Sequence, residues 1–282
     1  MDHSSDRTDE GLTRQVLVLV DPVARRADGE SVRIAKDVLC AGASVKVCLP
    51  EGPEEFAKAL ARRGARRPVV IGDDRALVRA VSLLHREREL SAAVLSMIPV
   101  GGAVSLARSL GIPVQTVAAA RAALDGAEHR LDLLVDESDG VVLGGLRIPP
   151  LAETRAGLIG AGPPWLRTCR SLVRTLAARP ARVTTLESGA QARLRVEVDG
   201  VTLIDLDEPV EGVSVKPAMG TGLARVEVRR AAPGSAPLRA QARAVTVSGE
   251  DFRYRADALA IAGPVRSRTW TVRAGAWGLT LP

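Results

Sequence analysis

Short apolar runs alternate with amphipathic stretches through the first half of the chain. The run Gln15–Val20 is almost wholly apolar, as expected for a strand buried on both faces of a parallel sheet. Further strands are predicted at Ser44–Leu49, Arg67–Ile71, Ala92–Ile98 and Leu131–Val135. Helical spacing of apolar residues predicts helices at 32–42 with Ser31 as the N-cap, at Pro53–Arg63, Ala76–Arg88, Ser105–Leu110 and Thr116–Leu124. Strands that alternate with helices in this way predict an α/β domain with a mostly parallel sheet.

Beyond Gly140 the pattern changes to short runs bounded by turns. Strands are predicted at Val141–Ile148, Ala192–Val198, Val201–Ile204, Gly222–Arg229, Leu238–Val247, Phe252–Ala256 and Trp270–Val272, with a hairpin turn at Asp199-Gly200. A basic amphipathic helix is predicted at Trp165–Ala177. We therefore predict a flexible N-terminus over residues 1–14, an α/β domain over 15–140 and an antiparallel β-sandwich domain over 141–282.

Composition places the chain among globular proteins. It has 282 residues, of which 46% are apolar and 26% charged, and this balance excludes a disordered or collagen-like chain. The excess of arginine over lysine is typical of a GC-rich bacterial genome. The three cysteines lack metal-ligand spacing, so we expect free, buried thiols and no metal site of their own. No apolar run is long enough to cross a bilayer and the chain begins with polar residues, which predicts a cytoplasmic protein.

Charge is unevenly divided between the two halves. Residues 1–150 carry 20 basic and 21 acidic side chains, whereas residues 151–282 carry 19 and 12. A basic second half favours anionic partners, such as a nucleotide or the inner face of a membrane, although arginines scattered over a solvated surface explain it equally well. Only six residues are aromatic and no reader motif is present, so nucleic acid is not a predicted partner. The sequence leaves open whether the protein forms a homodimer.

The loops that follow the predicted parallel strands carry the candidate chemistry. Ligands of open α/β sheets bind at the carboxyl ends of the strands, so Asp21, the segment 72–76, the pair Gly101-Gly102 and Asp132 are predicted to face one crevice. A glycine pair between a strand and a helix lets backbone N–H groups approach a phosphate, although it is also ordinary turn chemistry. The carboxylates Asp73 and Asp74 either contact a ribose or magnesium, or cap the following helix.

The order of these loops resembles the diacylglycerol kinase catalytic domain, a lipid kinase family related to sphingosine kinases and NAD kinases. The family shows Asn-Pro-x-Ser-Gly after the first strand, Gly-Gly-Asp-Gly-Thr after the third and Pro-x-Gly-Thr-x-Asn after the fourth. Here these places are held by residues 21–25 (DPVAR), 72–76 (GDDRA) and 99–104 (PVGGAV). The family's Asp-Gly-Glu of the second domain is matched by residues 257–259 (DAL), and the ending 273–277 (RAGAW) is similar to the family's closing strand.

This resemblance implies an ATP-dependent kinase that uses Mg²⁺ and phosphorylates a lipid hydroxyl. It implies nucleotide contacts at Asp21, at Gly72, Asp73, Asp74 and Arg75, and at Gly101 and Gly102. It also implies that Asp257 is a general base toward the lipid. Several family residues are replaced, however, because Asp73 and Arg75 stand where the family has glycines, and Gly102, Val104 and Leu259 stand where it has Thr, Asn and Glu.

Two functions therefore compete at the level of sequence. The first is a lipid kinase with weak or divergent phosphoryl transfer. The second is a catalytically inactive, pseudokinase-like protein that binds a nucleotide or another ligand and acts as a regulator. A separate hypothesis concerns Arg75 alone. Its guanidinium could replace part of the neutralisation of phosphate charge that the family's glycine loop supplies.

Overall fold

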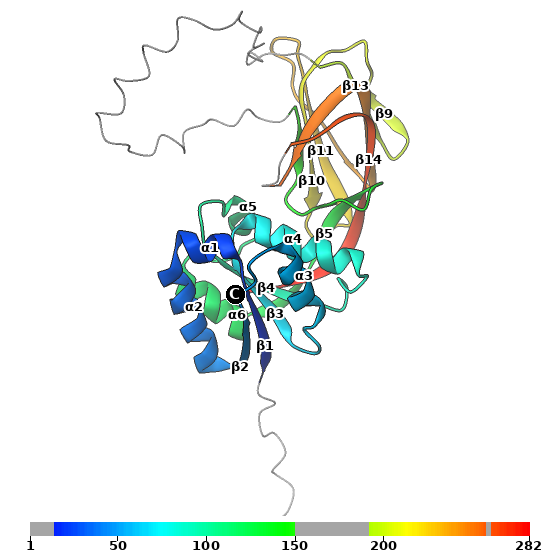
Figure 1. Cartoon of the computed structure of the whole chain (residues 1–282). Helices are drawn as coiled ribbons and strands as arrows, with labels where there is room; N and C mark the ends of the chain where they lie inside the picture. Colours follow the sequence, from blue (N-terminus) through cyan, green and yellow to red (C-terminus); the bar gives the residue numbers. More distant parts are fainter. Residues whose placement is uncertain (1–13, 150–191, 258–260) are drawn as a thin grey trace, which may run out of the picture.

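The computed structural model describes residues 14–149, 192–257 and 261–282. The predicted terminus 1–14 (apart from Arg14), the predicted helix Trp165–Ala177 and the departure at Leu259 lie outside the described residues. The chain forms a helical half and a β-rich half (Figure 1).

The helical half is built on four parallel strands in the order β2-β1-β3-β4. These strands are β1 Gln15–Val20, β2 Ser44–Cys48, β3 Arg67–Gly72 and β4 Val94–Pro99. The helices are α1 Pro22–Ala27, α2 Gly29–Gly42, α3 Pro53–Ala61, α4 Asp74–Arg86, α5 Ser105–Ser109 and α6 Thr116–Asp125. One core cluster packs α3, α4 and α5 against the sheet, and another packs α1, α2 and α6 against it. The predicted α/β class is confirmed.

The described strands of the β-rich half pair with one another antiparallel. They are β5 Ala127–Asp136, β6 Val141–Val142, β7 Leu146–Ile148, β8 Leu194–Val198, β9 Val201–Ile204, β10 Val210–Ala218, β11 Leu223–Arg230, β12 Leu238–Ala242, β13 Ala244–Ala256 and β14 Ile261–Leu281. Their inward residues form a third core in which Tyr254 meets Trp270 edge to face, at 5.1 Å between ring centroids. The turn Asp199-Gly200 has positive φ at both residues, as a tight β-hairpin requires, and joins β8 to β9 as predicted.

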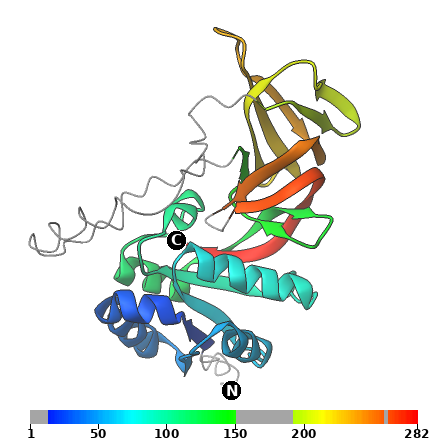
Figure 2. The ribbon, with the colours of Figure 1, turned by 45° about the horizontal axis from the view of Figure 1, so that its top comes forward.

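Strand β14 joins the two halves. Its first residues pair with β13, and near its end Gly278 and Leu279 pair in parallel with Val94 and Leu95 of β4. Both views show it leaving the β-rich half and entering the helical half (Figure 1, Figure 2). The last strand predicted for the parallel sheet, Leu131–Val135, lies in β5, which pairs antiparallel with β14 along most of its length. That prediction of orientation was wrong because the partner strand comes from the far end of the chain.

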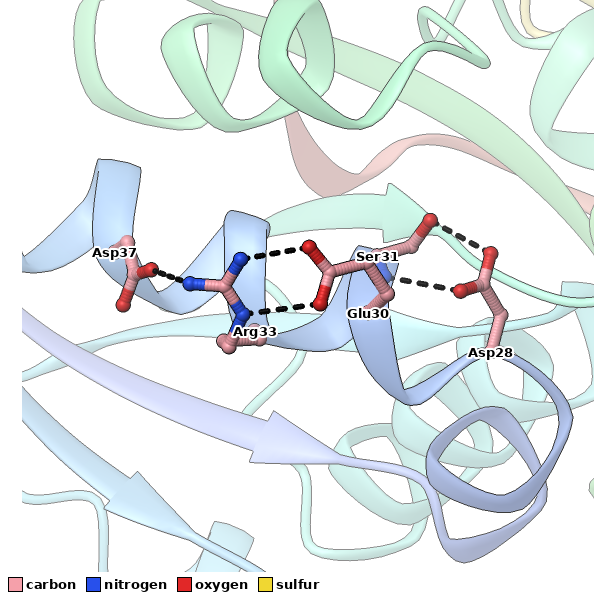
Figure 3. A network of polar contacts seen from close by, with 5 residues as sticks. All are labelled: Asp28, Glu30, Ser31, Arg33 and Asp37. Carbon is pink, nitrogen blue, oxygen red and sulfur yellow. Dashed lines mark hydrogen bonds and ion pairs between the residues drawn. The ribbon is translucent and has the colours of Figure 1, made fainter.

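Several predicted boundaries change. The N-cap of α2 is Asp28, not Ser31, since the Asp28 carboxylate accepts the Ser31 backbone N–H at 3.0 Å. Figure 3 shows this cap beside the pairs that Arg33 makes with Glu30 and Asp37. Other differences lie in the β-rich half: the run 141–148 forms two short strands, 238–247 is split at Arg243, 210–218 is a strand that was not predicted, and 270–272 is part of the longer β14.

The cysteine prediction is also corrected. Cys40 is exposed on α2 and Cys48 is half-buried at the end of β2. Both are free thiols, as expected, but neither is buried, because these positions fall on the outward face of α2 and on the edge strand β2.

Candidate functional site

The carboxyl ends of β1, β3 and β4 form one continuous edge. The Asp21 N–H donates to the Ile71 carbonyl at 2.9 Å, and the Val100 N–H donates to the Gly72 carbonyl at 2.8 Å. Gly72 is enclosed: an added Cβ would lie 2.6 Å from the Ala76 Cβ and 3.1 Å from the Asp21 Cβ. Glycine is therefore needed here for close packing between the end of β3, the start of α1 and the first turn of α4.

Asp21 is buried and paired with a residue that the sequence analysis missed. Its side chain is the N-cap of α1, accepting the Val23 N–H at 2.8 Å, and its other oxygen lies 2.6 Å from Nη1 of Arg79. Arg79 also lies over the Phe56 ring, 5.7 Å from its centroid. The negative charge that replaces the family's asparagine is thus balanced by a cation on α4. The helical spacing of α4 placed Arg79 beside its apolar stripe, but no sequence signal linked it to Asp21.

Asp73 and Arg75 take up the glycine positions of the family motif without backbone strain. Asp73 is extended, with φ −89°, and its carboxylate caps α4 by accepting the N–H groups of Arg75 and Ala76 at 3.0 and 3.2 Å. Arg75 is exposed, and its φ is not in the left-handed region. The capping interpretation of Asp73 is confirmed, and neither replacement places a side chain in the left-handed backbone region.

Asp74 is fully buried and anchors α5. Its Oδ2 accepts the Leu106 N–H at 2.8 Å and the Ser105 hydroxyl at 3.2 Å, and its Oδ1 accepts the Ala107 N–H at 2.9 Å. The carboxylate therefore occupies the N-terminus of α5, where its charge also interacts favourably with the helix dipole. The N–H groups of Leu106 and Ala107 are consequently unavailable to a phosphate.

Gly101 and Gly102 remain as the exposed backbone of this edge. Gly101 has φ +120°, a conformation that side chains other than glycine rarely adopt, and an added Cβ would lie 3.5 Å from the Asp73 Cβ. Gly102 has no atom within 4 Å of an added Cβ. Within the described part of the chain neither N–H donates to a carbonyl. The two donors are free to bind an anion that approaches from solvent.

Asp257 lies in a nest of backbone N–H groups at the end of β13. Its Oδ2 accepts the Leu143 N–H at 2.8 Å, and its Oδ1 accepts the N–H groups of Gly144 and Gly145 at 2.6 and 3.0 Å. Its φ is +48°, a left-handed conformation that aspartate tolerates better than most residues. Burial raises the pKa of Asp257; the three N–H groups lower it, and the charge of Asp74 raises it further.

The structure brings Asp257 and Asp74 close together through Gly144. An added Cβ on Gly144 would lie 2.6 Å from Leu106 Cδ1 and 3.3 Å from Asp257 Oδ1. Gly144 thus lets the nest pack directly on α5, the helix that Asp74 anchors. Of the predicted residues of the first half, Asp74 is thereby linked through α5 to the predicted aspartate of the second half.

Asp132 does not join them. Its carboxylate accepts the Gly222 N–H at 2.9 Å and the Gly275 N–H at 2.8 Å, and it is buried between the β10–β11 turn and the bulge of β14. The expectation that Asp132 faces the same crevice was wrong, since it lies within the antiparallel β5 rather than at the end of a parallel strand.

The carboxylates do not form a magnesium site of their own. No three acidic, histidine or cysteine side chains of residues 14–149, 192–257 and 261–282 are placed to hold one metal ion. Asp21, Asp74 and Asp257 have their oxygens engaged by Arg79 or by backbone N–H groups.

No helix of the described chain is long and apolar enough to span a membrane.

Comparison with known proteins identifies a family for the helical half. Residues 15–135 match the diacylglycerol kinase catalytic domain. No curated protein matches the chain in sequence.

Solved structures from Bacillus anthracis share the fold of almost the whole chain at low sequence identity. A candidate diacylglycerol kinase from Bacillus anthracis str. Sterne superposes with a TM-score of 0.72 at 14% identity, covering 97% of this chain and 99% of that one. A structure of a diacylglycerol kinase from the same organism gives a TM-score of 0.65 at 14% identity, with the same coverage. An NAD kinase from Archaeoglobus fulgidus in complex with ATP gives 0.49 at 13% identity, covering 94% of this chain and 93% of that one.

Proposed function

We propose, from the match of residues 15–135 to the diacylglycerol kinase catalytic domain, that the chain binds ATP and transfers its γ-phosphoryl group to a hydroxyl group of a lipid. The single observation that carries the proposal is the meeting of two features at α5. Gly101 and Gly102, whose N–H groups have no backbone partner in the described chain, directly precede this helix in the sequence, and Asp257 packs against it through Gly144.

The nucleotide phosphates bind over Gly101 and Gly102. Their N–H groups have no backbone partner in the described chain, and the space above Gly102 is open. Backbone donors suit a triphosphate because they add no bulk and need no reorganisation on binding. The pairing of Asp21 with Arg79 supports this placement, since it offsets a buried negative charge that would repel the phosphates.

Asp257 is the base for the lipid hydroxyl. A carboxylate offers about four lone-pair positions, and three are filled by N–H groups, so Oδ2, which accepts only one, keeps a position for the hydroxyl proton. The hydroxyl oxygen forms a bond to the γ-phosphorus as the bond to the β-phosphate oxygen breaks, and the proton passes to Asp257. The raised pKa of Asp257 makes it a better proton acceptor than an ordinary aspartate.

The second candidate is a nucleotide-binding regulator without turnover. Two observations favour it: both oxygens of Asp74 are engaged in anchoring α5, and the acidic Asp73 lies beside Gly101. A site with these constraints binds a nucleotide but stabilises less charge in the transition state.

A lipid phosphorylation assay separates the two candidates. The purified chain is incubated with radiolabelled ATP, Mg²⁺ and diacylglycerol in neutral detergent micelles, and labelled lipid is extracted. We expect a labelled lipid phosphate from the unaltered chain and its loss in Asp257→Asn.

The matched control for this assay is Asp199→Asn. Asp199 also has a left-handed backbone, with φ +49°, and accepts two backbone N–H groups, from Arg243 and Ala244, but in a hairpin of the β-rich half. This variant is expected to keep the activity. If the chain binds ATP but yields no labelled lipid, the kinase proposal is overturned in favour of the regulator. If it neither binds ATP nor labels the lipid, both proposals are overturned.

A further inference from the structure

One face of the β-rich half is strongly cationic. We call it the cationic face and define it by six basic residues on β7, β10, β11, β12 and β13: Arg147, Lys216, Arg225, Arg229, Arg239 and Arg255. Five of them are exposed and Arg255 is half-buried. The residues that alternate with them, such as Val215, Val226 and Val228, are completely buried in the core. The alternation places the basic side chains on the outer surface of the sheet.

Strand register confirms that these side chains share one side of the sheet. Residues paired directly across antiparallel strands point to the same face. One row runs from Arg255 through Arg147, Ser214 and Glu227 to Arg239. A neighbouring row joins Lys216 to Arg225 and Gln241, and Arg229 pairs with Gly212. Strands β10, β11 and β13 lie together in the upper part of Figure 1.

The positive charge of this face is only partly neutralised. Glu227 is the acidic residue in these rows, and it lies 3.2 Å from both Arg229 and Arg239. Among the residues that the structure describes, Arg147, Lys216 and Arg225 form no ion pair. A sheet face with this surplus attracts an extended anionic surface.

We infer that the cationic face docks the protein on an anionic lipid bilayer. The choice of a lipid surface rests on the proposed function, and position supports it. Arg147 follows Gly145 by two residues and Arg255 precedes Asp257 by two, so at about 3.3 Å per residue the face begins about 7 Å from the candidate base. Ile261, which pairs with Arg255 and is 42% exposed, adds an apolar contact beside this row.

The same observations disfavour nucleic acid as the occupant. Binding of single strands relies on aromatic side chains on which bases stack. The five aromatic side chains that the structure describes are all buried, at 6% exposure or less. A flat cationic face without stacking platforms fits phospholipid headgroups better than bases.

Vesicle flotation tests the inference. The full chain is mixed with vesicles of phosphatidylcholine alone or with about a third phosphatidylglycerol, at low and high salt. We expect binding only to the anionic vesicles, and its loss at high salt. Each basic residue near an anionic surface contributes about fivefold to partitioning, so the triple variant Arg147→Gln, Lys216→Gln, Arg225→Gln is expected to bind about 100-fold more weakly.

A matched triple variant controls for net charge. Arg62→Gln, Arg86→Gln, Arg121→Gln removes the same charge from three exposed residues of the helical half and is expected to bind almost as well as the unaltered chain. Equal weakening by both triple variants would overturn the inference, as would the absence of binding to anionic vesicles. Displacement from vesicles by single-stranded RNA at lower concentration than by anionic lipid would assign the face to nucleic acid instead.

Failure of the docking inference is distinguishable from failure of the kinase proposal. In neutral micelles the cationic-face variant is expected to phosphorylate lipid as fast as the unaltered chain, whereas on anionic vesicles it is expected to be slower. Activity that is unaffected in both settings contradicts docking alone. Absence of lipid phosphorylation in every setting contradicts the kinase proposal. Vesicle flotation would then still test whether the cationic face binds anionic lipid.

Discussion

Replacing Asp74 by alanine tests whether this carboxylate holds α5 in place. The substitution removes the acceptor of two buried N–H groups, those of Leu106 and Ala107, which lie 2.8 and 2.9 Å from its oxygens. A buried donor left without a partner costs about 1–3 kcal/mol, so the two together predict a loss of about 4 kcal/mol in the free energy of unfolding.

Urea denaturation followed by tryptophan fluorescence measures this loss, because Trp270 and Trp277 are completely buried. With a urea dependence of about 3 kcal/mol per molar, the midpoint is expected to fall by about 1.3 M. Asp74→Asn keeps one acceptor oxygen but turns an NH₂ group toward an N–H, so its midpoint is expected between those of the alanine variant and the unaltered chain.

Ser105→Ala is the matched control. It removes only the 3.2 Å hydroxyl contact to the same carboxylate and is expected to cost about 1 kcal/mol or less. A loss below about 1 kcal/mol in Asp74→Ala would refute the reasoning, since it would mean that the two N–H groups find water or other acceptors. The Asp74 carboxylate would then not be required to hold α5 and could contact a ligand instead.

Three further outcomes follow from the structure. Burial alone would raise the pKa of Asp136, but its hydrogen bonds and the nearby Arg268 hold this pKa below the ordinary value. The ionised carboxylate therefore stabilises the fold above about pH 4, and this stabilisation is lost as the pH falls through the lower folded-state pKa. Asp136→Asn is expected to flatten this acid dependence of the free energy of unfolding, measured by urea denaturation at several pH values. Arg79→Met leaves the Asp21 carboxylate buried without its cation and is expected to cost about 2 kcal/mol by the same method; no change would contradict the pairing. Gly101→Ala forces a side chain into φ +120° and is expected to cost about 1–2 kcal/mol, which differential scanning calorimetry would detect.

Local sequence patterns were sufficient to predict the parallel strands and most helices of the first half, but α1 (Pro22–Ala27) was not predicted. A strand buried on both faces, such as β1, leaves a continuous apolar run, and a helix such as α4 leaves an apolar stripe. The path of β14 could not be predicted in this way. Its pairing with β4 depends on residues nearly two hundred positions apart, and a strand pattern does not identify its partner.

Part of the spatial arrangement of the candidate residues was predictable, but their hydrogen bonding was not. The strand-end rule placed Asp21, Gly72 and Gly101 together, as the structure does. The roles of the carboxylates depend on contacts across the fold, such as Asp21 with Arg79 and Asp74 with α5, which no spacing reveals. The boundary at residue 140 between two domains stays a prediction. The end of β14 pairs with β4 of the first-half sheet, so the chain crosses back over this boundary.

The central claim is that the nucleotide phosphates bind over Gly101 and Gly102. Isothermal titration of Mg-ATP into the unaltered chain, Gly102→Ala and Gly102→Leu tests it most directly, because an added Cβ meets no atom within 4 Å and the fold is expected to keep its thermal stability. The account predicts that affinity falls stepwise with side-chain size and is lost in the leucine variant. Equal affinity in all three proteins, at unchanged stability, would contradict it.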